Sequence, residues 1–122
     1  MRFFALIMLF FSQIMAVHAD ELLEPEQAFK FSAQLVDADH LEVRYKIADG
    51  YYLYRNKLKF TLNGATLGAP QFPAGKIKQD PTFGSVETYH NEVRVKLPFT
   101  RTDATTITLK SSAQGCAEAG VC

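Results

Sequence analysis

The sequence predicts an all-β fold, built as an antiparallel sandwich, on the strength of three patterns. Several short segments alternate apolar and polar residues with a period of two, which places one set of side chains on each face of a strand. Short turn signals separate these segments, and no stretch keeps the 3.6-residue apolar period of an amphipathic helix. Because strands follow one another without intervening helices, we expect an immunoglobulin-like sandwich rather than a parallel sheet.

Residues 1–19 have the features of a cleavable signal peptide. Arg2 provides a positive start, an apolar run follows over 3–11, and small residues precede the expected cleavage point. The apolar run is shorter than the roughly 20 residues that a membrane-spanning helix needs. We therefore expect the mature chain to begin at Asp20 and to form a single domain over 20–122.

The near-neutral charge of the mature chain argues against nucleic acid and anionic membranes as partners. Removing Arg2 from 13 basic residues leaves 12, against 13 acidic residues. Such a balance provides no field that would attract nucleic acid or an anionic membrane surface. Export to an oxidising compartment permits a disulfide between the two cysteines.

Alternating segments mark the expected strands. The clearest is 41–47, where apolar and charged residues alternate and the turn Asp49-Gly50 follows. The aromatic run that starts at 51–54 is expected to extend toward Leu62 and to end at the turn Asn63-Gly64. Further strands are expected at 29–35, 93–99 and 107–109.

Two places interrupt the strand pattern. Pro98 has no backbone N–H to donate, so we expect it at a sheet edge or at the end of a strand. The region 64–85 is expected to contain a substantial surface loop, because prolines and glycines break any long ladder there. These residues are Pro70, Pro73, Pro81, Gly68, Gly75 and Gly84.

Cys116 and Cys122 lie close together near the end of the sequence, and Gly115 and Gly120 permit the tight backbone that would join them. In an exported domain the simplest interpretation is a structural staple. A closed loop of seven residues contributes only about 2.4 kcal/mol in the chain-entropy model, against about 4.7 kcal/mol for a loop of 100 residues. A short, accessible disulfide is better suited to exchange. The spacing by itself leaves both interpretations open.

Metal binding and hydrolysis have little support in the sequence. Two sulfur atoms cannot complete a structural zinc site, and His40 and His90 lack metal-ligand spacing to either cysteine. No Gly-x-Ser-x-Gly nucleophile elbow is present. We expect neither a metal nor an organic cofactor.

Three separated segments carry a family resemblance: GCAEAGVC at 115–122, DGYYLYR at 49–55, and DPTFG at 80–84 followed by Glu87 and Tyr89. They resemble the active-site signature, a second motif and the cap-loop region of the N-terminal periplasmic domains of the thiol:disulfide interchange protein DsbD. The resemblance implies an immunoglobulin-like redox domain in which a cap loop covers the cysteine pair. Such a domain would accept electrons from the thioredoxin-like domain of the same full-length protein. It would pass them to periplasmic disulfide isomerases and related thiol proteins.

The resemblance also implies roles for individual residues. Cys122 would attack the disulfide of a partner, and Cys116 would resolve the resulting mixed disulfide. Asp80, Tyr52 and Tyr54 match positions that surround the sulfur pair, where a carboxylate and phenols would influence proton transfer and thiolate stability. Ordinary strand packing of the tyrosines and a turn role for Asp80 before Pro81 are the simpler alternatives.

The sequence departs from the family pattern in two ways. Thr82 occupies the position of the usual aromatic shield in the cap loop, with Phe83 beside it. Phe83 would then cover the disulfide instead, or the cap would be polar, or Phe83 would only pack in the core. Family members also continue past the position of Cys122 into the rest of this domain, a membrane domain anchored in the bacterial inner membrane, and a thioredoxin-like domain. We therefore expect a C-terminally truncated domain.

A second function class is compatible with the same residues. An exported β-sandwich could act as a noncatalytic binding module that presents aromatic side chains to a partner, with the disulfide merely constraining a loop. The aromatic residues concerned are Tyr51, Tyr52, Tyr54 and Phe83.

Overall fold

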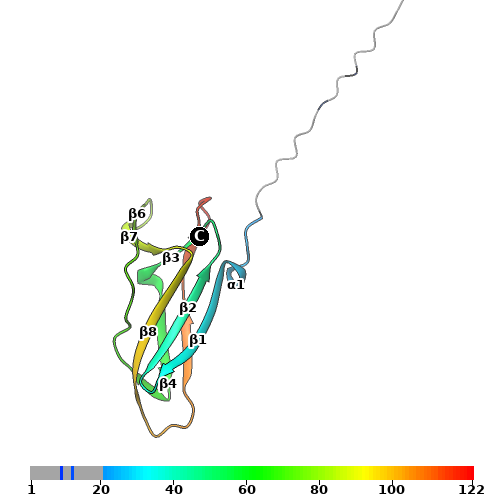
Figure 1. Cartoon of the computed structure of the whole chain (residues 1–122). Coiled ribbons are helices and arrows are strands. Elements are labelled where there is room, and N and C mark those ends of the chain that lie inside the picture. The colour runs from blue at the N-terminus through cyan, green and yellow to red at the C-terminus, as the bar shows by residue number, and fades with distance from the viewer. Residues whose placement is uncertain (1–8, 10–11, 13–20) are drawn as a thin grey trace, which may run out of the picture.

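The computed structural model of the protein describes Leu9, Ser12 and residues 21–122 (Figure 1). Apart from Leu9 and Ser12, the expected signal peptide at 1–19 lies outside the described residues, and its cleavage stays a prediction. In chain order the elements are α1 (Pro25–Ala28), β1 (Phe29–Asp37), β2 (His40–Ile47), β3 (Tyr51–Tyr54), the 3-10 helix η1 (Arg55–Lys57), β4 (Lys59–Asn63), β5 (Ala65–Leu67), β6 (Lys76–Asp80), β7 (Gly84–Tyr89), β8 (Glu92–Arg101), β9 (Thr108–Ser112) and β10 (Gly115–Ala117).

These strands form an antiparallel sandwich. One four-stranded sheet has the order β1-β2-β8-β5, a second has the order β10-β3-β7-β6, and β4 pairs with β9 in a two-stranded sheet. Each pairing between these strands is antiparallel. The predicted all-β, immunoglobulin-like architecture is therefore confirmed.

The core lies between the two larger sheets and follows from the two-residue period of the sequence. Val43 on β2 is opposite Val95 on β8, and both are fully buried. Leu97 on β8 and Leu53 on β3 are also fully buried in the same cluster. Alternate residues of β2 and β8 thus point inward, while the charged residues between them face solvent.

Two sequence expectations were wrong in detail. The run expected from Tyr51 toward Leu62 is broken by the 3-10 helix η1, so that β3 and β4 join different sheets. The region 64–85 holds β5 and most of a β6–β7 hairpin, so the expected loop is confined to 68–75, with a short turn at 81–83. Its prolines and glycines fall between or at the ends of these short strands, where they do not interrupt a ladder.

Pro98 lies inside β8, not at a sheet edge or a strand end. The pairing of β8 with β2 ends at His40 opposite Pro98, and its pairing with β5 begins one residue later at Phe99. Pro98 therefore occupies the point where one partner strand gives way to the next, which is where a missing backbone donor is tolerated.

The last strand docks at one end of the sandwich. Figure 1 shows α1, the β6–β7 hairpin and the C-terminus at this end, away from β4. Gly115, Cys116 and Ala117 of β10 pair with Leu53, Tyr52 and Tyr51 of β3. Gly115 leaves no room for a side chain, because an added Cβ would lie 2.2 Å from the carbonyl oxygen of Tyr52.

We predict that Gly115→Ala destabilises the domain by about 1–3 kcal/mol, the usual cost of overpacking a tight site. The new methyl group would press on the β3 backbone and force β10 away from it. Urea unfolding monitored by circular dichroism would measure the loss.

Ser112→Ala is the control, because Ser112 is exposed and lies on β9, the strand that precedes β10 in the chain. An unchanged unfolding midpoint in Gly115→Ala would show that β10 does not depend on its close approach to β3.

Candidate functional site

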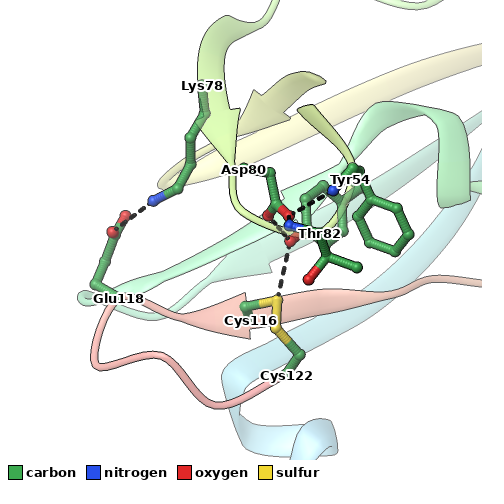
Figure 2. The surroundings of a disulfide bond; sticks show 8 residues. Tyr54, Lys78, Asp80, Thr82, Cys116, Glu118 and Cys122 are labelled. Atoms are coloured by element: carbon green, nitrogen blue, oxygen red, sulfur yellow. Dashed lines mark hydrogen bonds and ion pairs between the residues drawn. A yellow bond between two sulfur atoms is a disulfide. The ribbon is translucent and has the colours of Figure 1, made fainter. Parts of the chain in front are cut away.

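Cys116 and Cys122 form a disulfide with an S–S distance of 2.01 Å (Figure 2). Cys116 lies on β10 and is 2% exposed, whereas Cys122 follows the strand and is exposed. The pair is therefore asymmetric, because one cysteine belongs to the packed interior and the other is accessible from solvent.

A tight turn brings the chain back from Cys116 to Cys122. The N–H of Ala117 donates to the carbonyl of Val121 at 2.6 Å, and the N–H of Gly120 donates to the carbonyl of Ala117 at 2.9 Å. Gly120 has a φ of 100°, a conformation that favours glycine. The glycine noted in the sequence thus permits the turn that closes the disulfide.

Tyr54 connects the buried sulfur to a carboxylate. Its hydroxyl donates to Oδ2 of Asp80 at 2.5 Å and lies 3.2 Å from Sγ of Cys116. Figure 2 shows Tyr54 between the two groups. Since the Tyr54 hydroxyl donates its proton to Asp80, its oxygen can accept a hydrogen bond from Cys116 only when the disulfide is reduced and Cys116 carries a thiol proton.

Asp80 is nearly buried and is held from both sides. Its Oδ1 accepts the backbone N–H groups of Thr82 at 2.7 Å and Phe83 at 2.9 Å. The hydrogen bond from Tyr54, followed by that from Phe83, lowers the pKa of Asp80 below 3.8. Burial, followed by the hydrogen bond to Asp80, raises the pKa of Tyr54 far above its ordinary range. At neutral pH the pair is an ionised carboxylate and a protonated phenol.

Tyr52 contributes to the same buried cluster. It is 5% exposed, lies opposite Cys116 in the β10–β3 ladder, and packs edge-on against Tyr54 with ring centroids 5.5 Å apart. The ammonium of Lys78 lies 4.3 Å from the centre of the Tyr52 ring. Tyr52 therefore links the sulfur pair to charged groups at the sheet surface.

The expected cap loop is the turn between β6 and β7, at 81–83. Phe83 is 45% exposed, so the alternative that it only packs in the core is wrong. Its ring packs edge-on against Tyr54, with centroids 5.5 Å apart, and the ammonium of Lys57 lies 5.3 Å from its centre. Phe83 thus covers Tyr54, the residue that contacts Cys116. Thr82 is also exposed.

An apolar depression of about 180 Å³ adjoins the disulfide. It is lined by Cys116 and Cys122 together with residues of α1, β1, β3 and the segment before α1. Leu22 and Leu23 from that segment are partly exposed beside it. The surface around the accessible cysteine is therefore largely apolar.

No cluster of three or more His, Cys, Asp or Glu side chains within the described part of the chain could hold a metal ion. None of the helices among the described residues has the length and apolar character that crossing a bilayer requires.

Comparison with known proteins identifies the family. The family described as "Thiol:disulfide interchange protein DsbD, N-terminal" matches residues 19–122. This chain belongs to the DsbD N-terminal domain family. In this DsbD-family chain the cysteine pair lies beside Tyr52, Tyr54 and Asp80, next to the β6–β7 turn.

Full-length DsbD proteins are similar to the chain over most of its length. A thiol:disulfide interchange protein DsbD from Ralstonia nicotianae is 47% identical over 109 residues, which are 85% of this chain and 17% of that protein. The DsbD of Neisseria meningitidis serogroup A is 39% identical over 120 residues, or 98% of this chain and 20% of that protein. The chain thus spans about a fifth of these DsbD relatives.

Two solved DsbD structures have the same fold. The N-terminal domain of Neisseria meningitidis DsbD in the reduced form is 41% identical, with a TM-score of 0.72, and the match covers 83% of this chain and 81% of that one. The same DsbD domain in a complex with the PilB N-terminal domain is 42% identical, also with a TM-score of 0.72, over 88% and 84% of the two chains.

The sequence analysis did not predict one group of contacts beside the cysteine pair. Glu118, between the two cysteines, pairs with Lys78 at 3.1 Å and with His90 at 3.2 Å. The only signal in the sequence was an acidic residue inside the cysteine loop, because Lys78 and His90 are 40 and 28 residues away from it.

We predict that Tyr54→Phe raises the pKa of Asp80 toward 3.8, because the hydrogen bond from Tyr54 is the largest cause of its lowered value. A carboxyl whose pKa is lowered by folding stabilises the fold at every pH above its ordinary pKa. This contribution is lost as the pH falls through the pKa of the folded state. The stability of the parent should therefore fall more steeply below pH 3.8 than that of Tyr54→Phe. Carboxyl-carbon NMR titration and urea unfolding would measure both effects.

Tyr45→Phe provides a matched control, because the buried Tyr45 hydroxyl bonds Ser111 and not Asp80. The same Asp80 titration in the parent and in Tyr54→Phe would show that the phenol does not hold this carboxylate.

Proposed function

We propose that this domain performs thiol–disulfide exchange in the periplasm. In this proposal it accepts electrons from the thioredoxin-like domain of the full-length protein and passes them to disulfide isomerases and other periplasmic thiol proteins. The names of the relatives support the exchange chemistry. The complex of the Neisseria meningitidis DsbD domain with a PilB domain supports a protein as the partner.

The observation that carries the proposal is the asymmetry of the cysteine pair. Exchange requires one sulfur that a partner can reach and a second sulfur close enough to displace that partner. Cys122 is exposed, and Cys116 is bonded to it while being 2% exposed. We therefore assign the attack on the partner to Cys122 and the resolving step to Cys116.

In the first step the Cys122 thiolate attacks one sulfur of the partner disulfide. A bond forms between Cys122 and that sulfur, and the other partner sulfur leaves as a thiolate. In the second step Cys116 attacks Cys122, and the remaining partner sulfur leaves. The domain ends with the Cys116–Cys122 disulfide, and the partner gains the two electrons that the domain has lost.

Tyr54 and Asp80 are assigned to the control of the Cys116 proton. An ionised carboxylate behind the phenol disfavours a second negative charge on the adjacent sulfur, so Cys116 keeps its proton while Cys122 reacts. The lowered pKa of Asp80 makes it a weak base, so the Cys116 proton is lost to the departing partner thiolate or to solvent when Cys116 attacks. The Tyr54 oxygen, 3.2 Å from Sγ of Cys116, is placed to accept the thiol proton in a hydrogen bond until then.

Tyr52 and the cap loop are assigned to the shape of the site. Tyr52 packs against Tyr54 and maintains the wall next to Cys116. Thr82 and Phe83 anchor Asp80 through their backbone, and the Phe83 ring covers Tyr54. No cofactor is needed, because the two sulfur atoms themselves store the electron pair.

We predict that Cys116→Ser accumulates a mixed disulfide through Cys122 when it is mixed, in reduced form, with an oxidised disulfide isomerase. The resolving sulfur would be absent, so the adduct cannot be displaced from within the domain. Non-reducing electrophoresis and mass spectrometry would identify the adduct and the cysteine that carries it.

Cys122→Ser is the matched variant and should give little adduct, because its remaining cysteine is buried. A complete absence of adduct in Cys116→Ser, or equal adducts in both variants, would contradict the assignment of Cys122.

Phe83→Ala is predicted to accelerate reduction of the disulfide by glutathione severalfold, because the ring that covers Tyr54 would be removed. The rate can be followed by alkylating the free thiols at fixed times. Phe31→Ala is the control, since Phe31 on β1 is 48% exposed, close to the 45% of Phe83. Equal rates for the parent and Phe83→Ala would remove the protective role from Phe83.

A further inference from the structure

Glu118 joins the cysteine loop to the sheet beside it. Its carboxylate accepts a hydrogen bond from Nζ of Lys78 at 3.1 Å through one oxygen, and the other oxygen lies 3.2 Å from Nε2 of His90. Figure 2 shows Glu118 extending from the loop toward Lys78. We call Lys78, Glu118 and His90 the loop clasp.

The loop clasp is centred on Tyr52. The Lys78 ammonium lies 4.3 Å from the centre of the Tyr52 ring, and the His90 ring lies 5.7 Å from it. Tyr52 is in turn opposite Cys116 in the ladder between β10 and β3. The clasp therefore attaches the loop to the wall of the sulfur site and not to a remote surface.

The two contacts are half-exposed, so they contribute little to the stability of the whole domain. Their effect is expected to be local, because the loop has few other attachments. Glu118 also donates its backbone N–H to the carbonyl of Gly50 at 2.7 Å, while the bonds of Ala117, Gly120 and Val121 lie within the turn itself. The side chain of Glu118 is thus a main link from the turn to Lys78 on β6 and to His90, which follows β7. The pairing with Lys78, followed by that with His90, lowers the pKa of Glu118 and favours its charged form.

We propose that Glu118 is a positioning residue that keeps Cys122 close to Cys116 after their disulfide has been reduced. In the oxidised domain the covalent bond already orders the loop, so the clasp forms there without a further entropy cost and stabilises the oxidised form more than the reduced form. In the reduced domain only noncovalent contacts hold the turn, and the clasp restricts where Cys122 can move. The effective concentration of one thiol at the other then depends on Glu118. This inference rests on the proposed exchange function, since it matters only if the pair opens and closes.

The test is the equilibrium of the chain with glutathione. When the disulfide forms, Cys116 and Cys122 give up two electrons and two protons, and one molecule of glutathione disulfide becomes two glutathione thiols. We expect Glu118→Ala to lower the equilibrium constant for disulfide formation about threefold to fivefold, as the loss of two half-exposed contacts would. By the two-electron relation this is a shift of roughly 15–20 mV toward a more oxidising potential.

A second readout follows from the same effect. A looser loop leaves more of the chain as a mixed disulfide between glutathione and Cys122, because Cys116 displaces glutathione less readily. Mass spectrometry of acid-quenched samples should show this species enriched in Glu118→Ala. Lys78→Met should change the potential in the same direction, since it removes the ammonium and keeps an unbranched chain over Tyr52.

Glu92→Ala is the matched control. Glu92 on β8 also pairs with two basic side chains, Arg44 and Arg94, but on the other sheet. It should leave the potential unchanged. Glu118→Gln distinguishes the positioning effect from the effect of the negative charge. Its amide oxygen can still accept a hydrogen bond from Lys78, so its shift in potential should be smaller than that of Glu118→Ala.

Three results would overturn the positioning role: a parental potential in Glu118→Ala, an equal shift in Glu92→Ala, or equal shifts in Glu118→Gln and Glu118→Ala. The last result would place the effect in the charge of the carboxylate near the sulfurs. Failure of the exchange function is distinguishable, because the parent itself would then not equilibrate with glutathione.

Discussion

The pairing of β10 with β3 is the constraint on which the site depends. It buries Cys116 opposite Tyr52, and it requires glycine at 115 because the β3 backbone approaches too closely for a side chain. The following turn then returns the chain so that Cys122 bonds Cys116 from the exposed side. The difference between the two sulfurs therefore arises from strand pairing, with no need for any special property of either cysteine.

A single carboxylate couples the cap loop to the sulfur pair. The two oxygens of Asp80 have different partners: Oδ1 accepts the backbone of the β6–β7 turn, and Oδ2 accepts the Tyr54 hydroxyl. The turn conformation thus fixes the direction of the Tyr54 proton, and this leaves the Tyr54 oxygen facing Cys116. A movement of the turn would disturb both the cover over Tyr54 and the hydrogen bonds of the site. The β6–β7 turn therefore determines both the cover over Tyr54 and the hydrogen bonds assigned to the control of the Cys116 proton.

An immunoglobulin-like sandwich hosts many unrelated functions, so the fold alone would not identify this one. The family match and the cysteine site together support the proposed function, while the chain covers about a fifth of its full-length relatives. The electron source belongs to the proposal for the whole protein. The chemistry assigned to this domain needs only the two sulfurs, the Tyr54–Asp80 pair and an accessible surface beside Cys122.

The sequence by itself determined the β-rich architecture, the segments 29–35, 41–47 and 93–99, and the cysteine pair, because a two-residue period and local turn chemistry are visible without long-range information. It placed Asp80, Tyr52 and Tyr54 near the sulfurs only through family resemblance. The hairpin within 64–85, the position of Pro98 between two partner strands, and the pairing of Glu118 with Lys78 and His90 were decided by the tertiary structure. These features depend on which strands become neighbours across tens of residues, and no local pattern contains that information.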